Sequence, residues 1–356
     1  MTLEELRKQI DAIDSEIVER LNARVRLASE IGRLKKERGE EIYVPSREQQ
    51  VFEKIAALNG GPLEESALRF IYREIISASI RLEEEIVIAY LGPEGTFTQQ
   101  AAVKNFGSSQ KYRALNTIPD VITEVERGEA NYGVFPIENS TGGAVNHSQE
   151  RLVESDLKII AQVFLKVEHC LISNHPLEAI EVVYSKDQAL NQCRDWLRRH
   201  LPRAKQVEVD STSKGVVIAK ETEGAAAIAG ILASEQHRVP VVAENIQDAN
   251  DNSTRFLVIG RAVSPPTGNG RDRTSIVFTI RDEVAALQKA LEPFSSRGIN
   301  LCKIESRPSR RKAWDYYFFV DLIGHYDDPD VKAAMAELEQ RCPFVKWLGS
   351  YPNATA

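Results

Sequence analysis

The sequence has few of the residues that build metal sites and disulfide frameworks. Its 356 residues include four cysteines and six histidines. The cysteines are scattered and form no CxxC pair, and the histidines do not cluster with acidic residues at the spacing of metal ligands. We therefore expect free thiols in a reducing compartment, and chemistry that needs no metal and no cofactor.

An excess of positive charge and long apolar runs are also missing. Lysine and arginine number 45 against 52 acidic residues, which gives a formal charge of -7. A nucleic acid or an anionic membrane would need a basic face, so the charge argues against both as partners. No apolar signal segment follows Met1, and no apolar run approaches the length of a membrane span. These absences predict a cytoplasmic protein.

A helical pattern fills residues 1–85. Apolar residues recur every three or four positions, and no glycine or proline interrupts them before Gly32. A single helix of about 35 residues would be roughly 50 Å long. Two short helices from the same chain cannot cover such a stripe, which predicts a second subunit. The stripe consists of Leu3, Leu6, Ile10, Ile13, Ile17, Leu21, Val25, Ala28, Ile31 and Leu34.

Two further helices complete the first domain. Proline suits the first turn of a helix, so a second helix is expected from Pro45 to Leu58, before the break at Asn59-Gly60-Gly61-Pro62. A third is expected from about Leu63 to Glu85. Residues 1–85 therefore predict an all-α dimeric bundle, and the whole protein a homodimer or a dimer of dimers.

The pattern changes to strand followed by helix at Ile86. The runs at 86–92, 132–137, 158–167, 181–185 and 254–260 are typical of buried strands. Their alternation with helices predicts an α/β domain over residues 86–263 with a largely parallel sheet. The segment SPPTGNGRDR (264–273) is typical of a linker. After it, residues 273–351 follow the order βαββαβ of a ferredoxin-like domain.

Charged residues of the helical segment fall on shared faces. Arg24 and Lys35 lie eleven residues apart, which places them within roughly 20° on one helix. Ser79 and Glu83 lie one turn apart on another helix. Arg7 points about 100° away from Arg24 and would serve a different site. For any single arginine a solvated face is the simpler explanation, but together these residues favour a pocket for a small dianion.

The first 85 residues resemble the all-helical chorismate mutase family through ELRKQIDAIDSEIVERLNARVRLASEIGRLK and the following PSRE. The resemblance implies an interlocked dimer that rearranges chorismate to prephenate. In the implied roles, Arg24 and Arg47 hold the substrate carboxylates with Arg7 of the neighbouring subunit, and Glu48 takes the ring hydroxyl. Lys35 and Glu83 would donate hydrogen bonds to the ether oxygen, and Ser79 shares this site.

Two positions depart from that family. Val44 stands where many members have aspartate, which we expect to tune the activity without abolishing it. Glu83 stands where well-known members have glutamine. A carboxylate cannot donate a hydrogen bond, whereas a carboxylic acid can. We therefore expect Glu83 to have a raised pKa, or mutase activity to decline as the pH rises.

The middle domain contains GPEGTFT (92–98), PIENSTGGAV (136–145), YSKDQALNQC (184–193), DSTS (210–213) and NSTRFLVIG (252–260). No phosphate-binding glycine motif is present. In this order and spacing, the segments resemble prephenate dehydratase over residues 87–262. The resemblance implies two α/β lobes like those of periplasmic binding proteins, with the site in the cleft between them.

The implied reaction removes carbon dioxide and hydroxide from prephenate. Thr254 is the residue that the resemblance nominates as donor to the leaving hydroxyl. Arg255 is either a carboxylate anchor or part of an ion pair, and Phe256 is expected to pack. Uncharged polar residues suit carboxylate binding without a metal. These candidates are Asn139, Ser140, Thr141, Gln188, Ser211, Thr212 and Ser213, while His237, which replaces a common aromatic residue, is expected to be packed or on the surface.

The C-terminal segment resembles an ACT regulatory module over residues 274–350. Its marker CKIESRP (302–308) has Cys302 where serine or threonine is usual. The resemblance implies phenylalanine binding and feedback inhibition at a dimer interface. Ala285 occupies a position that is usually glycine, so we expect weaker phenylalanine binding; the alternative is a purely structural dimerisation domain. The implied ligand residues are Ala285, Ala286, Leu287, Glu305, Ser306, Arg307 and Pro308.

Two rival functions remain open from the sequence. A non-enzymatic amino-acid sensor could combine the same three domains, but it would not need the charged residues Arg24, Lys35, Arg47 and Glu48. A dehydratase that acts on arogenate, the amino form of prephenate, would need an acidic partner for the ammonium group. The fused mutase favours prephenate as the substrate, so the implied small-molecule partners are chorismate, prephenate and phenylalanine.

Overall fold

The computed structural model describes residues 1–141, 143–144, 148–249, 251–309 and 316–353. It divides the chain into two compact units. The helical unit comprises residues 1–86 together with 106–111, and the second unit comprises 87–105 and 112–356.

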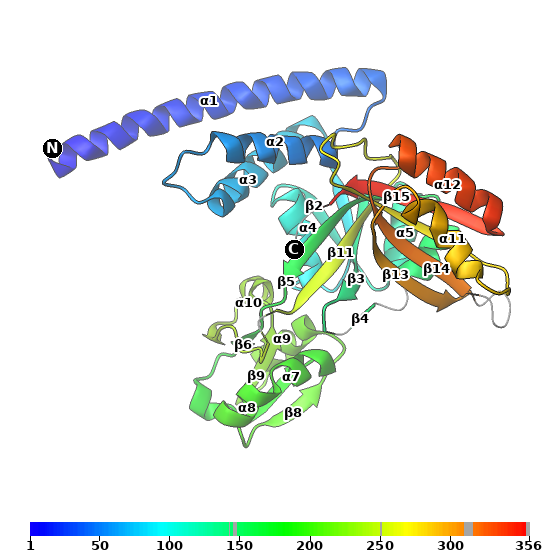
Figure 1. The fold of residues 1–356 in the computed structure, drawn as a ribbon. Coiled ribbons are helices and arrows are strands. Elements are labelled where there is room, and N and C mark those ends of the chain that lie inside the picture. The colour runs from blue at the N-terminus through cyan, green and yellow to red at the C-terminus, as the bar shows by residue number, and fades with distance from the viewer. Residues whose placement is uncertain (142, 145–147, 250, 310–315, 354–356) are drawn as a thin grey trace. The chain divides into compact units, whose positions relative to one another are not determined.

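Three helices build the helical unit, as the sequence predicts: α1 (Leu3–Arg38), α2 (Pro45–Leu58) and α3 (Glu65–Glu83) (Figure 1). A capping box starts α1, because Thr2 Oγ1 accepts from the Glu5 amide and Glu5 accepts from the Thr2 amide. Gly39 ends the helix in the left-handed conformation at φ 66°. The expected helix of about 35 residues is therefore confirmed.

The first half of α1 leaves its apolar stripe bare. Leu3, Leu6, Ile10, Ile13 and Ile17 are 66%, 42%, 56%, 57% and 48% exposed. Isolated exposed leucines are ordinary on a protein surface, but a contiguous apolar stripe normally meets a partner. None of the helices in the described ranges is both long enough and apolar enough to cross a membrane.

The first lobe of the second unit is a sheet in the order β2-β1-β3-β11-β5, with β4 paired to β3. Strands β3 and β11 are almost wholly buried, which explains their continuous apolar sequences. The elements of this lobe are β1 (Val87–Leu91), α4 (Phe97–Phe106), β2 (Lys111–Leu115), α5 (Ile118–Glu126), β3 (Tyr132–Asn139), β4 (Gly143–Ala144), α6 (Ser148–Glu154), β5 (Lys158–Lys166) and β11 (Ser253–Gly260).

The second lobe is a separate sheet in the order β10-β6-β9-β7-β8. Its central strand is the alanine run AAAIA, and every residue of that strand is buried. The elements are β6 (Cys170–Ile172), the 3-10 helix η1 (Leu177–Ala179), β7 (Val182–Ser185), α7 (Asp187–Gln192), α8 (Arg194–His200), β8 (Lys205–Glu208), α9 (Thr212–Glu221), β9 (Ala225–Ala229), α10 (Ile231–His237) and β10 (Val241–Ala243).

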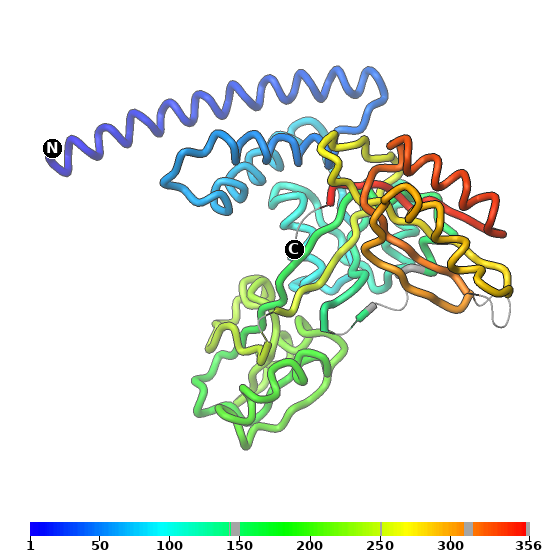
Figure 2. Tube along the Cα trace, in the orientation of Figure 1, coloured from blue at the N-terminus to red at the C-terminus, as the bar shows by residue number. Residues whose placement is uncertain are grey.

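The chain passes between the two lobes twice, after β5 and before β11 (Figure 2). The returning strand β11 lies between β3 and β5 and runs antiparallel to both. In the second lobe, β6 is antiparallel to β9 and β10. The expected largely parallel sheet is therefore wrong. Because β11 enters the first lobe from the end where β3 and β5 finish, it cannot run in their direction.

The C-terminal module (residues 272–353) has the predicted order βαββαβ. Its sheet order is β13-β14-β12-β15, and all neighbouring strands are antiparallel. The apolar face made by Ile276, Phe278, Val320 and Leu322 packs on the two helices. The elements are β12 (Asp272–Thr279), α11 (Ala286–Ser295), β13 (Leu301–Pro308), β14 (Tyr316–Ile323), α12 (Pro329–Arg341) and β15 (Phe344–Pro352).

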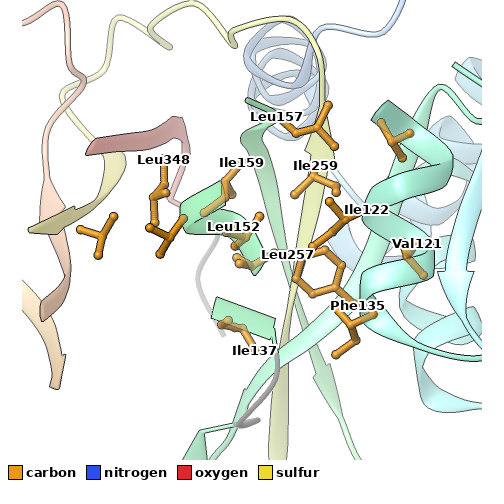
Figure 3. Close-up of a cluster of buried hydrophobic side chains, with 14 of the residues drawn as sticks. Val121, Ile122, Phe135, Ile137, Leu152, Leu157, Ile159, Leu257, Ile259 and Leu348 are labelled. Atoms are coloured by element: carbon orange, nitrogen blue, oxygen red, sulfur yellow. The ribbon is translucent and has the colours of Figure 1, made fainter. Parts of the chain in front are cut away.

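The other face of the module sheet shares a core with the first lobe. Leu348 of β15 lies beside Ile159 and Leu152 in one buried cluster (Figure 3). At Gly349, φ is 151° and an added Cβ would lie 2.1 Å from the carbonyl oxygen of Ile159, so only glycine lets the two backbones approach this closely. The first lobe and the module are therefore packed as one body.

Candidate active sites

In the helical unit, α1 and α3 bring Arg24 and Ser79 together. Nη1 of Arg24 donates to Oγ of Ser79 at 3.2 Å, and that hydroxyl donates to the carbonyl of Ile75 at 2.8 Å. Ser79 is buried, whereas Arg24 is half-buried. The remaining guanidinium donors of Arg24 are suited to a bidentate contact with a carboxylate.

Glu83 joins this group one turn farther along α3. Burial raises the pKa of its carboxyl above the ordinary value, although Lys35 and Arg24 oppose the shift. The expected raised pKa is thus borne out in direction. Gly32 of α1 makes room for the carboxyl, because a Cβ there would lie 2.5 Å from Oε2 of Glu83.

Lys35 lies at the end of the same face of α1. Its Nζ donates to the carbonyl oxygens of Glu41 at 3.1 Å and Ile42 at 3.0 Å. These bonds hold the ammonium group at the turn that follows the helix. The two predicted pairs, Arg24 with Lys35 and Ser79 with Glu83, therefore meet within one chain.

Glu48 and Arg73 form a buried ion pair between α2 and α3. Nη1 of Arg73 lies 2.5 Å from Oε2 of Glu48, and its guanidinium lies 4.8 Å from the centre of the Phe52 ring. Burial raises the pKa of Glu48 despite the opposing charge of Arg73. Among the described residues, Oε1 of Glu48 has no hydrogen-bond partner, so it can accept one from a ligand. The sequence reasoning missed Arg73.

The other two predicted arginines, Arg7 and Arg47, are exposed. Arg47 is exposed, and its Nη1 donates to Gln50 at 3.3 Å. Arg7 is exposed near the start of α1, seventeen residues before Arg24 and so about 25 Å away along the helix axis. Arg7 therefore cannot reach the Arg24 group of its own chain.

In the second unit, a cavity of about 330 Å³ opens between the two lobes. It lies where β3 and β5 end and β11 begins, so residues far apart in sequence meet there. Its lining is Leu91, Gly92, Thr96, Phe97, Thr98, Asn116, Pro136, Asn139, Val167, His169, Lys186, Gln188, Ala189, Gln192, Asp210, Ser211, Thr212, Asn252, Thr254 and Phe256.

Thr254 stands at one end of a chain of hydrogen bonds between neutral side chains. Its Oγ1 accepts from Nδ2 of Asn139 at 2.8 Å, and Oδ1 of Asn139 accepts from the hydroxyl of Thr141 at 2.7 Å. That hydroxyl accepts in turn from Nε2 of Gln192 at 3.1 Å. Because the Thr254 oxygen is an acceptor here, its own proton is available for a ligand.

His169 closes the chain at the other end. Its Nε2 lies 2.8 Å from Oε1 of Gln192, which can only accept, so Nε2 carries the proton. Burial lowers the pKa of His169, although Gln192 opposes the shift, and the ring is therefore neutral near pH 7. Its Nδ1 has no hydrogen-bond partner in the part of the chain that the structure describes, and its ring meets Phe97 edge-on.

The cavity is electrically suited to carboxylates. The first residues of α4, Phe97 and Thr98, line it, as do Ser211 and Thr212 at the start of α9. Helix N-termini attract anions through their free amides and the helix dipole. Lys186 is the one lysine or arginine among the described lining residues.

Four predicted binding residues are not among the residues that line the cavity: Ser140, Thr141, Ser213 and Arg255. Arg255 follows Thr254 on a strand, so its side chain points to the opposite face, where it is 3% exposed and pairs with Glu138 and Asp321. The ion-pair alternative is therefore the one that the structure supports. Ser213 is bonded to the Glu94 carbonyl and to His237, and Ser140 bonds the Asp251 carbonyl and the Ser253 amide.

The other predictions for this region divide into two groups. The cavity is lined by Asn139, Gln188, Ser211, Thr212, Thr254 and Phe256. The hydroxyl of Thr141 donates a hydrogen bond to Asn139. The sequence reasoning missed His169, Lys186, Gln192 and Asn252. Lys186 and Gln192 lie within the motif YSKDQALNQC and Asn252 begins the motif NSTRFLVIG, whereas His169 lies in none of the quoted motifs.

The predicted regulatory residues lie on two elements of the module. Ala285 precedes α11 with φ 62°, a left-handed conformation that favours glycine. Ala286 and Leu287 open that helix. On β13, Glu305 and Arg307 form an ion pair on one face, and Ser306 and Pro308 are exposed on the other.

Two protein families match consecutive parts of this chain. Chorismate mutase type II matches residues 6–84, and prephenate dehydratase matches residues 88–264. A bifunctional chorismate mutase/prephenate dehydratase from Aquifex aeolicus is 49% identical over 99% of this chain and 98% of its own length. The protein of the same name from Pseudomonas aeruginosa is 40% identical, also over 99% and 98%.

A solved structure resembles the second unit. The prephenate dehydratase from Arthrobacter aurescens in complex with L-Phe is 31% identical, with a TM-score of 0.71. The match covers 76% of this chain and 92% of that one.

Proposed function

Since this chain belongs to the family of bifunctional chorismate mutase/prephenate dehydratases and has both activities, we propose that its two sites act in sequence. The helical unit rearranges chorismate to prephenate. The cavity between the lobes then removes carbon dioxide and hydroxide from prephenate to give phenylpyruvate, a step of phenylalanine biosynthesis.

The mutase site works by positioning and charge. Arg24 and Arg47, with Arg7 of a second chain, hold the two carboxylates of chorismate, and the free oxygen of Glu48 accepts the ring hydroxyl. Negative charge develops on the ether oxygen as its C–O bond breaks. Lys35 and a protonated Glu83 donate to that oxygen, and their common face with Arg24 and Ser79 supports this assignment.

A second copy of the chain completes that site. The bare apolar stripe of α1 supports a dimer, because it is long, continuous and on the helix that carries Arg7. An antiparallel partner helix would bring its Arg7 to the Arg24 group, which Arg7 of the same chain cannot reach.

The observation that carries the dehydratase assignment is the bond from Asn139 to Thr254. It fixes the Thr254 oxygen as an acceptor and turns the hydroxyl proton outward. Aimed at the C4 hydroxyl of prephenate, that proton assists C–O cleavage while the electrons of the breaking carboxylate bond enter the ring. The hydroxide departs as water after taking the proton, carbon dioxide is released, and solvent returns a proton to Thr254.

The substrate of this cavity is the keto acid and not its amino counterpart. The ammonium group of arogenate would need a carboxylate partner. Asp210 is the one carboxylate among the lining residues that the structure describes, and Lys214 already pairs with it. The helix N-termini and Lys186 instead favour a dianion without an ammonium group.

Phenylalanine binds the C-terminal module, a ferredoxin-like domain of the ACT type, and inhibits the dehydratase. The Arthrobacter aurescens relative was solved in complex with L-Phe, which supports this ligand. The residues assigned to it are Ala285, Ala286, Leu287, Glu305, Ser306, Arg307 and Pro308. The methyl group of Ala285, at a position that favours close approach of the backbone, weakens this binding relative to a chain with glycine there.

One experiment tests the reaction sequence. The purified chain is given chorismate, and prephenate and phenylpyruvate are measured separately. The parent should form phenylpyruvate, whereas Thr254→Ala should accumulate prephenate, with dehydratase turnover reduced on the order of 10²- to 10⁴-fold. Thr254→Ser, which keeps a hydroxyl, is the matched control and should retain part of the turnover. Full dehydratase activity in Thr254→Ala would contradict the assignment.

A further inference from the structure

Two strands of the first lobe present one residue to the cavity and the neighbouring residue to the C-terminal module. Thr254 of β11 is paired with Asn139 of β3, and the next pair in the register is Arg255 with Glu138. Side chains alternate between the faces of a sheet. Thr254 and Asn139 therefore face the cavity, while Arg255 and Glu138 lie on the other side, toward the module.

The pair on the module side is fixed by several contacts. Nη1 of Arg255 lies 2.9 Å from Oε1 of Glu138 and 2.7 Å from Oδ2 of Asp321, which belongs to β14. Its Nη2 donates to the hydroxyl of Tyr351 on β15 at 2.8 Å. Nζ of Lys303 on β13 reaches the second oxygen of Glu138 at 2.6 Å. Strands β13, β14 and β15 of the module thus contact the adjacent strands β3 and β11 of the first lobe.

This cluster keeps its charges. Burial works against the guanidinium, but Tyr351, Asp321 and Glu138 together hold the pKa of Arg255 above its ordinary value. Burial alone would raise the pKa of Glu138, yet Lys303 and Arg255 hold it below its ordinary value. A buried ion pair is weak evidence for stability, because apolar residues of similar volume often serve as well. The cluster therefore calls for an explanation other than stability.

We infer that Arg255 and Glu138 are positioning residues of the dehydratase, through which the C-terminal module sets the placement of Thr254 and Asn139. This inference rests on the roles proposed above for those two residues. Adjacent residues on a strand cannot move independently, so a shift of Arg255 toward or away from Asp321 shifts Thr254 against the substrate. Displacements of about 1 Å at a reacting group can cost as much as 100-fold in rate. The module is thus a working part of the dehydratase site even without phenylalanine.

The test removes the charge of Asp321 and leaves its shape. Asp321→Asn in the full-length chain keeps one oxygen, which cannot serve Ser275 and Arg255 at once. Dehydratase kcat with prephenate, measured without phenylalanine, should fall roughly ten-fold, and KM should stay within about two-fold because the substrate contacts are intact. Glu339→Gln, an exposed change on α12 of the same module, is the matched control and should equal the parent.

A second pair of variants tests whether the effect passes through Arg255. Arg255→Lys keeps the charge but loses the fork that reaches Glu138, Asp321 and Tyr351 together, so kcat should fall. If both residues act through one contact, the double variant Arg255→Lys/Asp321→Asn should be no slower than the slower single variant. Multiplied effects would show that the two residues act separately and would overturn the inference.

Mutase activity of the same samples reports folding of the rest of the chain and should not change. An Asp321→Asn enzyme with parental kcat, or with raised KM alone, contradicts the inference. If Asp321→Asn does not fold, Lys303→Gln at the edge of the cluster tests the inference instead. Its dehydratase kcat should be roughly three-fold lower, and an unchanged kcat would overturn the inference. Thr254→Ala distinguishes failure of the proposed function from failure of the positioning role. If Thr254→Ala is active, the proposed function is wrong. If Thr254→Ala is inactive while Asp321→Asn has parental activity, only the positioning role is wrong.

Discussion

In the helical unit the polar side chains that come together are charged, whereas in the cavity between the lobes they are nearly all neutral. Arg24, Lys35 and Glu83 share one face of the helices. Thr254, Asn139, Thr141, Gln192 and His169 form a hydrogen-bonded chain without a formal charge. In the proposed mutase site the first group also takes an arginine from a second chain, whereas all members of the second group belong to one chain.

The difference follows from the two reactions. The mutase step has no leaving group and no proton transfer, so fixed charge against the breaking C–O bond is what the protein can add. The dehydratase step expels a hydroxide, which needs one correctly positioned proton donor and little electrostatic stabilisation by charged side chains. Substitutions should therefore act through charge in the helical unit and through orientation in the cavity.

The largest expected effect is at Arg24. Arg24→Gln removes a bidentate carboxylate contact and a positive charge, so mutase kcat/KM should fall on the order of 10²- to 10³-fold, with dehydratase activity unchanged. Chorismate consumption measures this directly. Arg33→Gln is the control, because Arg33 lies on the same helix and pairs with the exposed Glu30 and Glu37. A loss of similar size in Arg33→Gln would show that Arg24 has no special role in substrate binding.

Next is His169, where orientation and not charge is at stake. His169→Phe keeps the ring volume but removes the donor to Gln192, so the chain to Thr254 loosens. Dehydratase kcat should fall roughly ten-fold with the mutase unaffected. The exposed His200, which stacks on Trp196, supplies the control His200→Phe. If His169→Phe keeps parental turnover, the neutral chain does not position Thr254.

A smaller effect is expected in the pH dependence of the mutase. Because burial raises the pKa of Glu83, its protonated, donating form persists above the ordinary carboxyl range and is lost as the pH rises through the raised pKa. Mutase activity should decline over that interval. Glu83→Gln donates at every pH and should flatten the profile. Parallel profiles for the two enzymes would contradict a donating role for Glu83.

The smallest expected effect concerns Ala285. Ala285 adds a methyl group at a position where glycine would allow close approach of the backbone, so Ala285→Gly should tighten phenylalanine binding several-fold. Calorimetry with phenylalanine measures the change. Ala286→Gly, one residue later at the start of α11, is the matched control and should not gain affinity. No heat from either protein at millimolar phenylalanine would support a purely structural module.

Much of the architecture could be predicted because each element has its own periodicity. The stripe of α1, the proline at the start of α2 and the apolar run of β11 are local signals that the structure repeats residue by residue. The direction of β11 was not predictable in this way. It depends on the chain leaving the first lobe and returning, which no local pattern records.

The sites divide along the same line. Helix geometry predicted that Arg24 and Lys35 share a face of one helix and that Ser79 and Glu83 share a face of another. That these two faces form one site was implied only by the resemblance to the chorismate mutase family. Arg255 was left open between a carboxylate anchor and an ion pair, although strand alternation could have placed Arg255 and Thr254 on opposite faces. The sequence did not show that Asp321 would receive Arg255. His169 and Gln192 come from different segments of the chain, so only the fold reveals that they meet.

The core that the first lobe shares with the module has a consequence for any shortened form of this protein. A chain cut within the linker at 264–271 would expose Ile137, Leu152, Ile159 and Leu257, which Leu348 and Phe319 now help to cover. A bare sheet face of that kind is an aggregation hazard. We therefore expect residues 86–263 alone to aggregate, whereas a chain from residue 87 to 353 would keep this core covered.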